Sequence, residues 1–177
     1  MQDASAPRPP SLIKLGKLAN SKQFDKLSEL WPEAVANPDH PAEDLLGIAG
    51  QVYRLGDQER ADTFATTVVE QIESRDGNAA ALAAAREAAH QLPTDAPAVR
   101  EQLHRLYRQA HPDFEALPGL LDLVAGADQD QAQAVAKLDR YCQLRPGCFL
   151  VDYSFVMPGV VERVDPATGV ITARFED

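Results

Sequence analysis

The sequence has only two cysteines in 177 residues, and this scarcity argues against two kinds of stabilising site. Cys142 and Cys148 lie six positions apart, with no further Cys or His cluster beside them. That spacing fits neither a zinc site nor a disulfide framework. We therefore predict that both residues are reduced structural thiols.

Long apolar runs are missing too. No stretch of about eighteen consecutive apolar residues is present to span a membrane. The opening residues MQDASAPRPPS lack the apolar segment of a secretory signal. These absences predict no membrane partner and favour a cytoplasmic location.

Motifs of catalysis and of cofactor binding are absent as well. The sequence contains no GxSxG, GxxxxGKS/T or GxGxxG pattern, so we predict that the protein is not an enzyme and binds no cofactor. Four histidines are dispersed without a Cys or carboxylate at a ligand spacing such as HExxH, which favours surface or capping roles over a metal site. They are His40, His90, His104 and His111.

Two other motifs favour structural roles. Asp128 and Asp130, in GADQDQ, superficially resemble a calcium loop, but the Gly and terminal Glu positions are wrong, and a helix cap is the better interpretation. Trp31, the only tryptophan, lies on an apolar stripe with Leu27, which predicts a core position.

Positive charge is scarce, because the formal net charge is −10. A chain of this charge lacks the clustered Lys and Arg that nucleic-acid binding requires. The distribution is uneven: residues 1–30 carry five cations against three carboxylates, a net of +2, which leaves −12 on the remainder. The basic segment, with Lys14 and Lys17, is either a solvated helix face or an edge that meets an acidic partner.

What the sequence does contain is helical periodicity. Residues 1–10 are rich in Pro and small polar residues, and we predict a disordered leader there. Residues 11–145 show apolar stripes at steps of three and four, divided by Pro, Gly and Asp. Helix pairs over about 11–36, 41–75 and 78–109 predict a stack of antiparallel hairpins of the tetratricopeptide (TPR) type, with a compact irregular bundle as the alternative.

Local signals mark the ends of these helices. Ser21, Asp57 and Asp95 are predicted caps at helix starts, and Gly56 is a predicted helix end. Pro32 is expected to kink or divide its helix near Trp31. The segment NAAALAAAREAAHQL, with its small side chains, is expected to lie between neighbouring helices.

The last residues have a different pattern. Arg145-Pro146-Gly147 ends the final helix, because Pro cannot continue it. Three β-rich runs follow, at 148–153, 159–164 and 169–175, with a DPATG turn between the last two. Residues 146–177 are therefore predicted to form a small module, a three-stranded antiparallel meander.

This final region resembles a known family. LRPGCFLV, followed by SFVMPGVVERVDPATGVITARFED, is similar to the Tudor-like or SH3-like module beside a helical-repeat region in extended Gre-type transcript cleavage factors, and to modules of CarD-type regulators. The helical strings FDKLSELWPEAV and LGDQERADTFATTVVE extend the likeness over most of residues 12–177. The matching positions are Pro146-Gly147, Gly159, Asp165, Gly169 and Phe175-Glu176.

The match is incomplete. Asp152 stands near an expected His, Phe155 near an expected Trp, and Gly159 is the one member present of a glycine pair. The coiled coil with acidic tip residues that hold magnesium in Gre catalysis is not found in the sequence. A small barrel generally needs about five strands. We therefore expect either a leading fragment of a longer polypeptide or a sheet that completes itself against the helices.

Two functional hypotheses follow. By resemblance, the chain is a non-catalytic interaction region that docks to bacterial RNA polymerase or positions a Gre-type factor. Its expected contacts are the apolar tip Phe155, Val156 and Met157, which either meets a partner or docks on the protein's own helices, the strand residues Arg163 and Arg174, and secondarily Lys14 and Lys17.

The alternative is a general TPR-like peptide-binding adaptor unrelated to transcription. Its ligand contacts would lie on the helices, and Tyr53 and Tyr107 are the candidates to line a groove. For both tyrosines, packing within the fold is the favoured interpretation.

Overall fold

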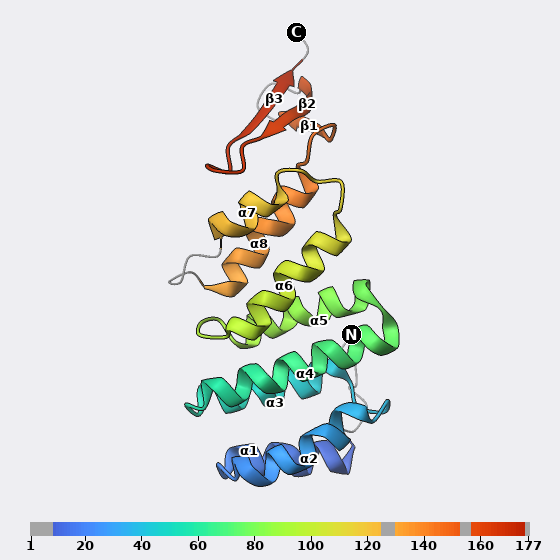
Figure 1. Cartoon of the computed structure of the whole chain (residues 1–177), viewed down its shortest axis with the longest axis vertical. Coiled ribbons are helices and arrows are strands. Elements are labelled where there is room, and N and C mark those ends of the chain that lie inside the picture. Colours follow the sequence, from blue (N-terminus) through green and yellow to red (C-terminus); the bar gives the residue numbers. More distant parts are fainter. Residues whose placement is uncertain (1–8, 125–129, 153–156, 176–177) are drawn as a thin grey trace. The chain divides into compact units, whose positions relative to one another are not determined.

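The computed structural model describes residues 9–124, 130–152 and 157–175, with only the backbone described at 151, 152 and 157. This described part is mainly helical and includes a small three-stranded antiparallel sheet (Figure 1). The predicted order, helices first and strands last, is confirmed. The elements are α1 (Pro10–Asn20), α2 (Phe24–Ala36), α3 (Ala42–Arg54), α4 (Gln58–Asp76), α5 (Asn78–Gln91), α6 (Pro97–Ala110), α7 (Leu117–Val124), α8 (Gln131–Gln143), β1 (Phe149–Asp152), β2 (Met157–Val164) and β3 (Ile171–Phe175).

Several helix ends follow the local signals in the sequence. The carboxylate of Asp57 accepts a hydrogen bond from the N–H of Arg60 at the start of α4 (3.2 Å). Asp130 accepts one from the N–H of Ala132 at the start of α8 (2.8 Å). Gly56 follows α3 with φ of 101°, a conformation that side chains disfavour. These two caps and this helix end were predicted correctly.

The prediction for Ser21 was wrong. Ser21 does not cap the start of α2. It lies at the end of α1, where its hydroxyl donates to the carbonyl of Lys17 (2.8 Å). Ser can bond at either end of a helix, so the residue type alone does not decide its role. Pro32 was expected to kink or divide its helix, and it does not divide it, because α2 is continuous from Phe24 to Ala36.

The chain forms two compact units, Met1–Leu103 and His104–Asp177. The division falls inside α6, whereas the change from helix to strand falls between α8 and β1. The three strands therefore share a unit with α7 and α8.

In Met1–Leu103, α1 contacts α2 and α3, α2 also contacts α4, and α3, α4 and α5 all contact one another. Small side chains allow the close approach: Ala49, Ala65, Ala81 and Ala85 are fully buried. The alanine-rich helix α5 contacts both α3 and α4, as its composition predicted.

Trp31 joins α2 to α4 in this core, as predicted. Its ring stacks on Phe64, with centroids 4.3 Å apart and planes 16° from parallel. Its indole N–H donates to the backbone carbonyl of Phe64 (3.3 Å). The one polar atom of a large buried ring is thus satisfied.

The start of α6 is capped from another helix. The carboxylate of Asp62, in α4, accepts hydrogen bonds from the N–H groups of Ala98 and Val99, both at 2.9 Å. The sequence had assigned this role to Asp95, which is nearer in the chain. Asp95 adopts φ of 48° in the turn before the helix, and Asp62 reaches the free N–H groups instead.

His40 is buried and has the predicted capping role. Its Nδ1 donates to the carbonyl of Ala34 in the last turn of α2 (2.8 Å), and the Ser11 hydroxyl lies 2.6 Å from Nε2. With Nδ1 carrying a proton for Ala34, Nε2 is the acceptor for Ser11 in the neutral ring. The imidazole therefore ties the start of α1 to the end of α2.

In His104–Asp177, α7 packs on α8 around buried leucines such as Leu120, Leu121 and Leu138. The strands follow in the order β1-β2-β3, each pair antiparallel. Phe149 pairs with Val160, and Val160 with Arg174. A register shift lies between Val161 and Arg163. Among the described residues, β1 and β3 are the edge strands.

Candidate protein-interaction site

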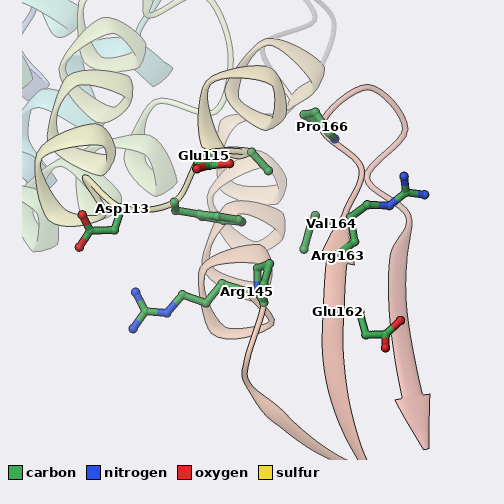
Figure 2. A pocket seen from close by; sticks show the side chains of 10 residues that line it. Asp113, Glu115, Arg145, Glu162, Arg163, Val164 and Pro166 are labelled. Atoms are coloured by element: carbon green, nitrogen blue, oxygen red, sulfur yellow. The ribbon is translucent and has the colours of Figure 1, made fainter.

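The sheet has one covered face and one open face. Cross-strand partners point to the same side of a sheet, and successive residues to opposite sides. Val161 and Val164 of β2 are buried and make up the covered face. Figure 2 shows Val164 pointing towards the helices, whereas Glu162 and Arg163 point away from them. We call the open side the outer face; it consists of Phe149, Val160, Glu162, Arg163, Thr172 and Arg174.

The turn between β2 and β3 anchors the sheet to the helices. Pro166 lies so close to Gly119 of α7 that a Cβ at that glycine would be 2.6 Å from the proline Cβ. Gly169, with φ of 69°, lies directly against the Tyr141 hydroxyl of α8, and Leu123 is also near. Because Gly119 and Gly169 have no Cβ, the turn can contact α7 and α8 directly. These contacts fix the orientation of the sheet within this unit.

Asp165 fixes the conformation of the same turn. Its carboxylate accepts hydrogen bonds from the N–H groups of Ala167 (2.9 Å) and Thr168 (3.3 Å). The bond from Ala167, with those from Thr168 and the positive charge of Arg163, lowers the pKa of Asp165 below its ordinary value. The turn is therefore held by a charged carboxylate.

A wedge-shaped hollow of about 510 Å³ lies where β2 meets the helical part of this unit (Figure 2). Phe114 and Val164, both buried, contribute to its apolar lining. Its lining also includes Asp113, Glu115 and Arg145 on the helical side, and Glu162 and Arg163 of β2, whose side chains point away from the helices (Figure 2). A hollow with a partly apolar lining can accept an apolar side chain of a partner.

The outer face has an unusual degree of apolar exposure. Phe149 is 83% exposed, although it belongs to a strand. It lies in register with Val160 and Arg174. Arg174 in turn forms an ion pair with Glu162 (3.2 Å). An aromatic ring and two arginines on one open surface match the residue types enriched in protein interfaces.

The structure places Arg163 and Arg174, two of the contact residues expected from the sequence, on the outer face. Phe155 and Val156, the rest of that site's apolar tip, lie outside the described residues, and Met157 is described only by its backbone at the start of β2. Phe149 was missed. The alternation of Phe149 with Leu150 along a short strand was a signal that could have identified it.

The remaining candidates lie elsewhere. Lys14, Lys17 and Tyr53 belong to the other unit, Met1–Leu103. Tyr53 is half-buried, and its hydroxyl is 2.6 Å from that of Thr94. Tyr107 has no exposed surface and donates a hydrogen bond to Asp139 (2.6 Å). It is therefore a core residue and not a contact residue, in agreement with the packing interpretation.

Residues 9–124, 130–152 and 157–175 hold no group of three or more His, Cys, Asp or Glu side chains placed to bind a metal ion. Within the same residues, no helix has the length and apolar character to cross a membrane. Cys142 is buried and Cys148 half-buried, and neither forms a disulfide within these residues, in agreement with the predicted thiols.

Comparisons with known proteins supply no relative. No protein-family model, no curated protein and no solved structure matches the chain.

Proposed function

We propose that this chain is a non-catalytic protein-interaction region, and that the outer face of its sheet is the docking surface. The observation that supports the proposal most strongly is Phe149, a large aromatic side chain left 83% exposed beside two arginines. Exposed apolar side chains gathered with arginine are typical of docking surfaces.

The proposed partner is bacterial RNA polymerase, bound directly or together with a Gre-type factor. Support for this partner comes from the sequence resemblance, with a TPR-like helical region followed by a partial Tudor-like or SH3-like module. The observed change from helices to a three-stranded meander after α8 is compatible with that organisation. The proposal places the protein in the cytoplasm.

The test is direct binding of the intact chain to immobilised bacterial RNA polymerase. Phe149→Ser should weaken binding about tenfold or more, because truncation of a central aromatic residue commonly costs roughly 2 kcal/mol of binding free energy. Ile13→Ser is the matched control, because it removes an exposed apolar side chain from the other unit.

The outcomes separate the partner from the surface. If the intact chain does not bind polymerase, the proposed partner is wrong. If it binds and Phe149→Ser has no more effect than Ile13→Ser, the outer face is not the docking surface. In that case an adaptor that uses its helices becomes the better description.

A further inference from the structure

A second hollow, of about 580 Å³, lies in Met1–Leu103 and is independent of the sheet. Its walls come from α1 and α3, with Gln91 of α5 at one end. Gln51 donates a hydrogen bond to Asn20 across it. Because α1 and α3 are in contact and supply all the lining residues except Gln91, they form the two sides of a groove.

Two glycines in this groove have no explanation in packing. A Cβ at Gly16 of α1 or at Gly47 of α3 would have no atom within 4 Å. Neither glycine adopts positive φ. Glycine within a helix lowers stability relative to alanine. Gly50 differs, because a Cβ there would be 2.9 Å from the Cβ of Gln91. Gly16 and Gly47 therefore keep the groove open without serving the fold.

Charge is distributed unevenly along the groove. Glu43 lies in the first turn of α3 and Arg54 in its last turn. Eleven residues of helix separate them by about 16 Å. Lys17 projects from α1 between these ends. In the described part of the chain, neither Lys17 nor Arg54 forms an ion pair. One end of the groove is acidic and the other is cationic.

Side-chain amides lie at the cationic end. Asn20, Gln51 and Gln91 line the groove beside Arg54. Asn20 is exposed, so its amide N–H groups face solvent while its carbonyl oxygen accepts from Gln51. Amide groups carry both donors and acceptors, which are the groups that an extended peptide backbone requires.

We propose that this groove binds an extended peptide segment of about five residues, with a carboxylate side chain at the Arg54 end and a basic side chain at the Glu43 end. Five extended residues span about 16 Å, which matches the separation of the charged ends. Gly16 and Gly47 let the peptide backbone approach the helices, and the opposite charges set its orientation.

The test uses synthetic pentapeptides with blocked termini, titrated into the full-length chain and followed by backbone amide NMR shifts. One peptide has lysine at the first position and glutamate at the last, and a second has the reverse order. Both are needed because the proposal fixes the charge at each end of the groove but not the direction in which the peptide chain runs. A third has glutamine at both ends. The two end-charged peptides, or one of them, should bind at least about fivefold more tightly than the neutral peptide, as expected for an added ion pair near a protein surface.

Two sets of variants test the mechanism. Arg54→Glu should abolish the preference for the end-charged peptide and create a preference for a peptide with lysine at both ends, whereas Lys26→Glu, an exposed charge reversal on α2 away from the groove, should do neither. Gly16→Ala with Gly47→Ala should raise Tm and weaken binding together. If the two glycines had a purely structural role, Tm and peptide binding would not change in opposite directions.

Three results would overturn the proposal: equal binding of charged and neutral peptides, shifts that do not map to α1 and α3, or alanine variants that bind as well as the parent. Loss of polymerase binding on changing Phe149 has no bearing on these measurements. The two proposals therefore fail separately.

Discussion

The two units differ in how completely they cover their apolar surface. Five large apolar side chains are exposed among the described residues, and four of them, Leu123, Phe149, Val170 and Phe175, belong to His104–Asp177. Met1–Leu103 has one, Ile13. Alanine-rich helices pack against neighbours on several sides, whereas a three-stranded sheet with helices on one face leaves the other face open. This difference is the observation behind the proposed docking surface on the sheet of the second unit.

The largest expected effect tests whether Met1–Leu103 depends on its closed core. Trp31→Ala removes the ring stacked on Phe64 and the hydrogen bond to its carbonyl. We expect this variant to lose about 3–5 kcal/mol of the free energy of unfolding. Because Trp31 is the only tryptophan, circular dichroism and amide hydrogen exchange of α2 and α4 replace fluorescence as the measurement.

Phe149→Ala is the counterpart in the second unit. With 83% of the side chain already in water, its removal should change stability by no more than about 0.5 kcal/mol. Comparable losses in Trp31→Ala and Phe149→Ala would contradict the contrast between a closed unit and an open one.

A smaller effect concerns two glycines, one in each unit. Gly119→Ala places a Cβ 2.6 Å from the ring of Pro166 and 3.2 Å from its carbonyl oxygen, neither of which can rotate away. Overpacking should outweigh the gain in helix propensity and give a net loss of about 1–2 kcal/mol. Gly47→Ala meets open space and should stabilise by about 0.5–1 kcal/mol.

Denaturant unfolding of the two variants checks these opposite signs. NMR shifts in Gly119→Ala should be largest in the turn between β2 and β3, where Pro166 must move. If Gly119→Ala is as stable as the parent and its turn is unchanged, the turn is not anchored through this contact.

How much of the fold could be predicted from the sequence depends on whether the residues that form a feature are close together in the chain. Helical stripes, the caps at Asp57 and Asp130, and the three strands were all readable, because each depends on residues close together in the chain. The cap of α6 was not, because Asp62 comes from another helix. No local pattern identifies a capping group so far away in the sequence.

The candidate site was predicted only in part for a similar reason. Arg163 and Arg174 were both among the predicted contacts, and the register of β2 and β3 places them on the same face. Which face is open depends on the contact of Pro166 with Gly119, which is tertiary. That contact decides which face the helices cover, and therefore leaves Phe149 exposed. Alternation along a strand separates the two faces but does not say which of them is covered.

The smallest effect is electrostatic and lies in the turn that orients the open face. Hydrogen bonds from Ala167 and Thr168 lower the pKa of Asp165. A carboxyl with a lower pKa in the folded state stabilises the fold above its unfolded pKa of about 3.9, and that contribution is lost as the pH falls through the folded value. Carboxyl carbon NMR of the intact chain should therefore give Asp165 a pKa below about 3.9.

Asp165→Asn provides the control for this titration. The amide oxygen can still accept from Ala167, so the turn should persist at neutral pH, while the acid-dependent change in the amide shifts of Ala167 and Thr168 should vanish. A pKa at or above the ordinary value, or shifts at Ala167 and Thr168 that still titrate in the asparagine variant, would show that this carboxylate does not hold the turn. The orientation of the outer face would then depend on the glycine contacts alone.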